Sequence, residues 1–234
     1  MYQEHKMLLW APPKKEDKEQ ITDKIVNLLN CFKEHEIYFP YVYVHKSYQL
    51  FNINHLEVSQ ILKTSKVSKS SEELGYGLSF VSSLDLENCA SLSIIVGIFS
   101  QQFINSIIID ISEDYFYNMI NSNKIESLFC NCVLIGSPFW GAIVNQEILD
   151  KYHNGSYWKK EKLCSVHWIN YFSGEMLCRI QNIIPELPQS CIYNSLGDGI
   201  FLQISKQPIN LYNEDDIHLQ KSINRMLKLD CTGG

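Results

Sequence analysis

The chain has 234 residues, of which 45% are apolar and 20% are charged. This is an ordinary globular composition, and it excludes disordered and collagen-like proteins. The net charge of −6 is uneven, because residues 70–150 hold ten acidic residues and a single base, Lys124. Nucleic-acid binding needs clustered Lys and Arg, so we expect no nucleic-acid partner.

The first part of the chain predicts one strand and two helices. The apolar residues 7–10 indicate a short strand that ends before the prolines at 12 and 13. Residues 16–35 carry apolar side chains at offsets of three and four, which predicts a helix with one buried stripe. Residues 54–63 predict a second helix, with Asn54 as its N-cap.

A change to two-residue periodicity then predicts three strands within 76–81, 92–98 and 107–111. Only short polar segments separate these runs, which favours an antiparallel meander over a parallel sheet. The alternation predicts a shared sheet core made by Leu78, Phe80, Ile94, Val96, Ile107 and Ile109.

The remaining elements are mixed. Residues 114–129 predict a helix, and residues 132–136 predict a fourth strand. Residues 139–152 predict irregular structure or a helix. Residues 166–172 fit either a strand or the start of a helix. Gly197-Asp198-Gly199 between two β-rich runs predicts a hairpin over 192–204. Asn213 and three following acids favour a last helix over 214–227. The order indicates the α+β class, with helices packed on a mainly antiparallel sheet, in a single domain spanning 1–234.

No motif predicts catalytic chemistry, a cofactor or a metal. Gly75 and Gly77 lack the third glycine of a dinucleotide loop and precede a strand, so they are interpreted as turn and strand-edge residues. Cys130 with Cys132, and Cys164 with His167, are weak candidates for a zinc site, which typically needs four ligands in two tight pairs. We therefore expect no catalytic residue and no bound metal or cofactor.

The compartment is predicted from two further features. The start of the chain has no secretion signal, and no segment has the roughly 20 continuous apolar residues of a membrane helix. Eight cysteines are spread thinly over the chain and several lie in apolar runs. We interpret them as reduced thiols and expect a cytoplasmic protein with no membrane partner.

An ordered series of short motifs resembles the immunity protein 52 family, antitoxins encoded beside polymorphic toxins in bacteria. The motifs are Trp10-Ala11-Pro12-Pro13, Glu72-Glu73-Leu74-Gly75, Asn105-Ser106, Trp168-Ile169-Asn170-Tyr171-Phe172-Ser173 and the segment from Asn213 to His218. The sequence departs from the family at His167, where a glycine is expected. The resemblance implies a non-enzymatic inhibitor of one cognate toxin, often a nuclease, and it carries over no catalytic residue.

With a basic nuclease toxin as the partner, the acidic residues of 70–150 would bind that toxin, since opposite charges accelerate association. The candidate partner-binding residues are Asp85, Glu87, Glu113, Asp114 and Glu126. In the simpler alternative the acids form only a solvated face, and Trp140 and Trp158 hold the partner. Two other functions stay open at this point: a small cytoplasmic enzyme with an unrecognised site, and a structural or adaptor subunit.

Overall fold

The structure is a computed structural model that describes residues 5–44, 46–68, 71–85, 89–148 and 165–229. The described residues form two compact units. The N-terminal unit is Met7–Pro138, and the C-terminal unit contains the described residues of 139–234 and of 1–6. Each unit combines antiparallel strands with helices, which confirms the α+β class. The single domain over 1–234 stays a prediction.

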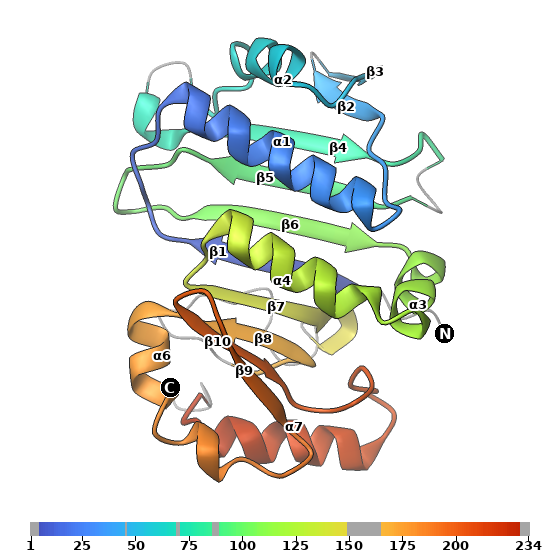
Figure 1. The fold of residues 1–234 in the computed structure, drawn as a ribbon, viewed down its shortest axis with the longest axis vertical. Helices are drawn as coiled ribbons and strands as arrows, with labels where there is room; N and C mark the ends of the chain where they lie inside the picture. Colours follow the sequence, from blue (N-terminus) through green and yellow to red (C-terminus); the bar gives the residue numbers. More distant parts are fainter. Residues whose placement is uncertain (1–4, 45, 69–70, 86–88, 149–164, 230–234) are drawn as a thin grey trace. The chain divides into compact units, whose positions relative to one another are not determined.

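The N-terminal unit contains a six-stranded part of a sheet, with strands in the order β3-β2-β4-β5-β6-β1 (Figure 1). Its elements are β1 (His5–Ala11, of which Met7–Ala11 belong to this unit), α1 (Lys18–Glu34), β2 (Tyr41–Val44), β3 (Ser47–Leu50), α2 (His55–Leu62), β4 (Tyr76–Val81), β5 (Ser91–Val96), β6 (Asn105–Ile111), α3 (Glu113–Asn121) and α4 (Lys124–Gly136). Among the described residues of the chain, no helix has the length and apolar composition to cross a membrane.

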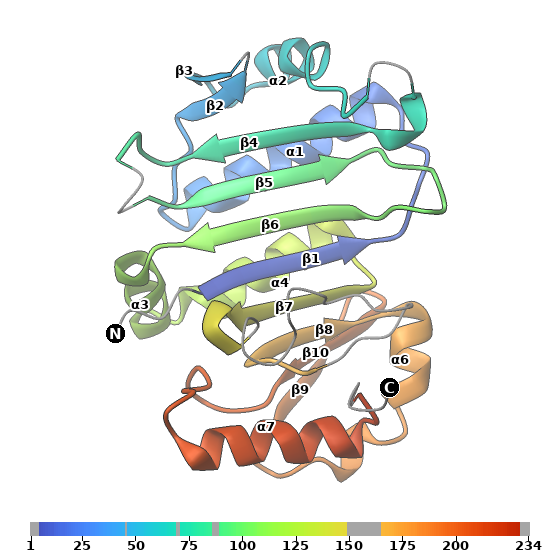
Figure 2. The same ribbon diagram turned by 180° about the vertical axis from the view of Figure 1, so that it is seen from behind.

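The predicted meander is confirmed. β5 pairs antiparallel with both β4 and β6, and the register places Leu78 opposite Ile94 and Ile94 opposite Ile107. All six predicted core residues are at most 5% exposed. α1 and α4 cover this apolar face, and no described helix of the unit covers the opposite face (Figure 2). Ser79 and Ser93 pair on that second face and are partly exposed. Antiparallel sheets commonly have one such solvated face.

Local capping explains where the first two helices begin. Asp17 accepts a hydrogen bond from the backbone N–H of Gln20 at 2.8 Å, and the Gln20 side chain accepts one from the backbone N–H of Asp17 at 3.0 Å. This capping box satisfies two backbone donors that the first turn of α1 leaves open. Asn54 caps α2 through the backbone N–H of Glu57 at 2.9 Å, as the sequence predicts.

The region 114–136 differs from the prediction. The helix predicted over 114–129 is two helices, because Asn123 adopts a left-handed conformation with φ 55° between α3 and α4. The strand predicted over 132–136 is wrong, since those residues form the end of α4. Residues 125, 128, 129, 132, 133 and 136 are the buried positions, and their offsets of three and four define one continuous helical stripe.

The C-terminal unit contains four strands in the order β7-β8-β10-β9. Its main elements are β7 (Trp140–Asn145), β8 (Ile169–Phe172), α6 (Gly174–Ile180), β9 (Ile192–Leu196), β10 (Gly199–Gln203) and α7 (Glu214–Met226). The hairpin of β9 and β10 and the helix α7 with its Asn213 cap are confirmed. The prediction of irregular or helical structure over 139–152 is wrong for residues 140–145, which form β7, and the open choice over 166–172 resolves to β8.

The Trp168–Ser173 motif has a clear structural role in this unit. Trp168 Nε1 donates a hydrogen bond to the Ser205 carbonyl at 2.9 Å, and the Asn170 side chain donates to the His167 carbonyl at 2.7 Å. The Tyr171 hydroxyl donates to Asp198 Oδ1 at 2.7 Å, which ties β8 to the turn between β9 and β10. The motif therefore positions strands.

We expect Tyr171→Phe to lower the free energy of unfolding by about 1–3 kcal/mol at neutral pH, since the bond to the Asp198 carboxylate is lost. Burial, with the Asp198 hydrogen bond adding to it, raises the pKa of Tyr171 from 10.0 to about 12. A raised folded-state pKa gives stability that is fully present below pH 10 and is lost as the pH rises towards 12. The wild type should therefore lose more stability than the variant over that interval. Urea unfolding between pH 8 and 12 checks this, and equal losses in both proteins would contradict it.

Candidate functional site

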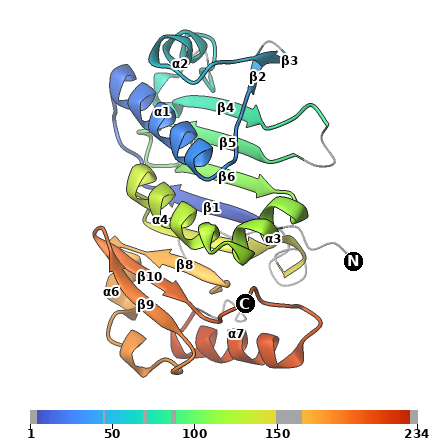
Figure 3. The same ribbon diagram turned by 45° about the vertical axis from the view of Figure 1, so that its right-hand side comes forward.

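The strand register brings two of the predicted acidic segments to one end of the meander. Val81, the last residue of β4, pairs with Ser91, and Ser91 pairs with Asp110 near the end of β6. The loop after β4 and the start of α3 consequently leave the sheet at the same end, which comes forward in Figure 3. We call Asp85, Asp110 and Glu113 at this place the acidic end.

Asp85 and Asp110 act on a common neighbour. Asp85 is exposed in the loop after β4. Burial raises the pKa of the Cys89 thiol, and the carboxylates of Asp85 and Asp110 raise it further. Asp110 Oδ2 also accepts a hydrogen bond from Ser91 Oγ at 3.1 Å. Both carboxylates therefore lie close enough to Cys89 to contribute to one local negative potential.

Glu113 is the first residue of α3 and is partly buried. A carboxylate at this position interacts favourably with the positive end of the helix dipole. Its Oε2 is buried and accepts no hydrogen bond within the described part of the chain. An unsatisfied buried acceptor carries a desolvation cost.

The other three predicted residues have different outcomes. Glu87 lies outside the described residues. Asp114 is the second residue of α3, so its backbone lies at the acidic end. Glu126 lies in the first turn of α4. Burial, and to a smaller extent the charge of Glu126, raise the pKa of Cys130 to about 11.

Exposed apolar and aromatic side chains accompany the acids. Leu84 precedes Asp85 and is 56% exposed, while Tyr115 and Tyr117 on α3 are 38% and 42% exposed. Lys124, the base that the acidic segment contains, donates to the Glu36 carboxylate at 2.7 Å. Tyrosine is enriched at protein interfaces, and the surface here combines it with negative charge.

The alternative anchors proposed from the sequence have less support. Trp140 lies in β7 and is fully buried, so it is not available to a partner in this structure. Trp158 lies outside the described residues. An anchor at Trp140 is therefore wrong, because its strand has six consecutive buried residues and no exposed face.

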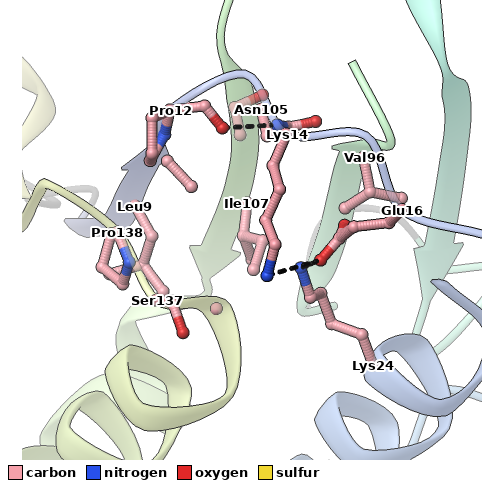
Figure 4. Close-up of a pocket in the computed structure, with 13 residues that line it drawn as sticks. Leu9, Pro12, Lys14, Glu16, Lys24, Val96, Asn105, Ile107, Ser137 and Pro138 are labelled. Atoms are coloured by element: carbon pink, nitrogen blue, oxygen red, sulfur yellow. Dashed lines mark hydrogen bonds and ion pairs between the residues drawn. The ribbon is translucent and has the colours of Figure 1, made fainter. Parts of the chain in front are cut away.

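A cavity of about 140 Å³ lies at the opposite end of the same sheet, between the start of α1 and the end of α4 (Figure 4). Its polar lining comes from Lys14, Glu16, Lys24, Asn105, Ser106 and Ser137. These groups are largely engaged with one another or with the backbone. Glu16 Oε1 accepts from Lys24 Nζ at 2.6 Å, and Asn105 Nδ2 donates to the carbonyl of residue 12 at 2.8 Å.

The cavity has a structural explanation. Asn105 Oδ1 also accepts from the backbone N–H of Ile98 at 2.8 Å, so one buried amide joins β6 to the segments that follow β5 and β1. Its lining contains neither a histidine nor a cysteine. Across the described residues of the chain, no group of three or more His, Cys, Asp or Glu side chains is arranged to hold a metal ion.

The fold and these surfaces define an α+β protein with an acidic, tyrosine-bearing end. No protein-family model matches the chain, and no curated protein matches it. A solved structure described as Pseudomonas aeruginosa T6SS protein PA0821 is similar over 97% of this chain and 72% of its own, with a TM-score of 0.69 and 12% sequence identity. At this identity the likeness shows a shared fold.

Proposed function

We propose that the chain is an immunity protein that binds and neutralises a cognate toxin in bacterial competition of the type VI secretion kind. The acidic end is the observation that carries this proposal. The shared fold with a T6SS protein and the resemblance to the immunity protein 52 family support it. The proposal includes no catalytic residue and no cofactor.

The chemistry of the acidic end suggests the nature of the toxin. A nuclease presents a basic surface to its substrate, and an acidic surface is complementary to it. Asp85, Asp110 and Glu113 supply negative charge, and Tyr115 and Tyr117 supply contact area. Aromatic groups inside a charged rim are the usual composition of a tight interface. We therefore propose a basic, nuclease-type toxin whose active surface is occluded.

The proposal also places the chain in the cytoplasm of the toxin-producing cell, a reducing compartment in which free thiols persist. The six described cysteines 31, 89, 130, 132, 178 and 191 are unbridged in the structure.

The test is association with the protein encoded next to this chain's gene. We expect co-expression to give a complex and to restore growth that the neighbouring protein alone prevents. Reversing Asp85→Lys together with Glu113→Lys should slow association about tenfold or more at low ionic strength, and should flatten its dependence on salt. Stopped-flow or surface-based kinetics at several salt concentrations measure both effects.

A matched control changes the same amount of charge elsewhere. Glu175 and Glu186 are exposed in the C-terminal unit, so Glu175→Lys with Glu186→Lys tests net charge without altering the acidic end. Asp85→Lys alone, at an exposed loop site, guards against a folding defect at the partly buried Glu113. Equal association rates for the two double variants would contradict a role for the acidic end. A neighbouring protein that neither binds nor kills would contradict the immunity function itself.

A further inference from the structure

The strand β9 of the C-terminal unit is an edge strand that is exposed on both faces. Among the described strands it ends the order β7-β8-β10-β9, beside β10 (Figure 1). Ile192 and Tyr193 point to opposite faces, because side chains alternate along a strand, and they are 49% and 45% exposed. Charged residues, proline or a bulge commonly protect such edges. Residues 192–196 contain neither a charged residue nor a proline, and their pairing with β10 is continuous.

The turn between β9 and β10 determines which backbone groups reach the open edge. It has two residues, and the first, Gly197, has the positive φ of 57° that tight hairpin turns use. The residues that flank such a turn, Leu196 and Gly199, form a hydrogen-bonded pair. Hydrogen-bonded and non-hydrogen-bonded pairs alternate along an antiparallel ladder. The N–H and C=O groups of Tyr193 and Ser195 therefore point away from β10, towards the open edge.

We propose that the chain forms a dimer in which β9 pairs antiparallel with β9 of a second copy, about a two-fold axis between the two Asn194 residues. We call these paired edges the β9 seam. The register places Tyr193 of each copy opposite Ser195 of the other. Because both residues point their backbone groups outward, each of the two pairs exchanges two hydrogen bonds, and the seam contains four. The same edge serves both copies, as a two-fold dimer requires.

The side chains of β9 suit this register. Ile192 of one copy lies opposite Leu196 of the other, which gives an apolar pair on each side of the axis. Asp198 is the single charged residue within 190–203, and it lies in the turn, so the two Asp198 residues are at opposite ends of the seam. A chain with a net charge of −6 repels its own copies, and an uncharged edge is where that repulsion is weakest.

The other terminal strand, β3, is less suited to the same pairing. It has four residues, and the turn that precedes it contains Lys46, a residue type that protects edges. The chain leaves the edge directly after β3, because Phe51 is 3% exposed and its backbone N–H donates to the Pro40 carbonyl at 2.8 Å. The exposed Gln49 of β3 therefore provides a control site on an edge strand that we expect to stay unpaired.

The length of the seam sets the expected strength of the dimer. Two strands of five residues make a small contact. Stable interfaces bury roughly 1,200 Å² or more, and smaller contacts belong to weak or transient complexes. We therefore expect a reversible dimer that forms as the protein concentration rises. This inference does not depend on the proposed toxin, because the dimer forms from this chain alone.

The experiment measures the mass of the full-length protein by sedimentation equilibrium over a range of concentrations. Asn194 is exposed and faces its own copy across the axis, so charged variants alter the seam without altering the core. Asn194→Lys and Asn194→Asp should each raise the dissociation constant of the dimer about tenfold or more, since like charges then lie opposite each other. An equal mixture of these two variants should dimerise again, because opposite charges then meet.

Two further variants control for charge and for folding. Gln49→Lys adds the same charge to β3 and should leave the dissociation constant unchanged. Ser195→Pro removes an outward N–H but no hydrogen bond to β10, so the hairpin should form while the dimer is lost. Thermal unfolding of each variant confirms that it folds.

Three results would overturn the proposal. The first is a wild-type chain that stays monomeric up to millimolar concentration. The second is a dimer that Asn194→Lys leaves intact, above all if Gln49→Lys disrupts it, since the contact would then lie at β3. The third is a mixture of the two Asn194 variants that does not dimerise, which would contradict the two-fold register.

Discussion

Replacing Gly75 with alanine is expected to lower the free energy of unfolding by about 3 kcal/mol or more. Gly75 has φ +65° and ψ −145°, a conformation that L-residues rarely adopt. A Cβ atom there would lie 2.2 Å from the Val96 carbonyl oxygen and 2.7 Å from the carbonyl carbon of Gly97. Both contacts are with backbone at the end of β5, which moves only by disturbing the sheet. The backbone strain at positive φ and the steric clash of the Cβ atom therefore both lower the free energy of unfolding, and their effects add.

Gly77, two residues later, is the matched control. Its φ is ordinary, and a Cβ there would meet only Val67 Cγ2, at 3.5 Å. We expect Gly77→Ala to change the free energy of unfolding by about 1 kcal/mol or less. Urea unfolding of both variants measures the difference. Similar losses of unfolding free energy at the two positions would contradict a requirement for glycine at position 75.

A second large effect is expected in the core of the meander. Ile94 is 1% exposed beneath the helices, whereas its neighbour Ile95 points to the opposite face and is 37% exposed. Ile94→Ala should cost about 2–5 kcal/mol, because it removes buried methyl groups and leaves a cavity. Ile95→Ala should cost about 1 kcal/mol or less, mainly through lower strand propensity.

Equilibrium unfolding in urea also tests this pair. The comparison is sensitive to register, since a slip of one residue along β5 would exchange the two faces. A greater loss for Ile95→Ala than for Ile94→Ala would therefore contradict the pairing of β5 with β4 and β6.

Periodicity explains which parts of the fold were predictable. The two-residue alternation in β4, β5 and β6 and the helical stripe of α1 each have one face in the core, so their patterns are visible in the sequence. β7 is buried on both faces and shows no alternation, and it contains Gly141 and Ala142, which are weak strand formers. The end of α4 is a short apolar run, which fits a strand or a buried helix equally well.

Local conformation accounts for two other differences. A left-handed Asn123 separates α3 from α4, and no sequence pattern other than the Ser-Asn pair marks that break. The hairpin of β2 and β3 was not predicted. Its strands pair with Tyr43 opposite Tyr48, and the two rings pack edge to face at 5.2 Å. β3 is a short edge strand with four exposed residues, and β2 has a single buried residue, so neither strand has a strong hydrophobic pattern.

The acidic end was predictable only in part. Charge counting and loop position identified Asp85 and Glu113, and the register then brought their segments together. Asp110 was missed because it alternates with buried isoleucines and looks like the solvent side of a strand. Its position is set by pairing with Ser91, a contact across 19 residues of sequence. Glu126 follows α3 in the chain and lies in the first turn of α4, and its role in binding stays a prediction.

The position of β1 beside β6 has a consequence for synthesis of the chain. β1 is made before β6, and this neighbour, Asn105–Ile111, follows about 100 residues later. At translation rates of roughly 5–20 residues per second, Met7, Leu8, Leu9 and Trp10 wait some 5–20 s for the strand beside them. During that interval the ribosome-bound chain exposes four apolar side chains that are at most 8% exposed in the folded protein. β1 therefore pairs with β6 only after the meander has emerged.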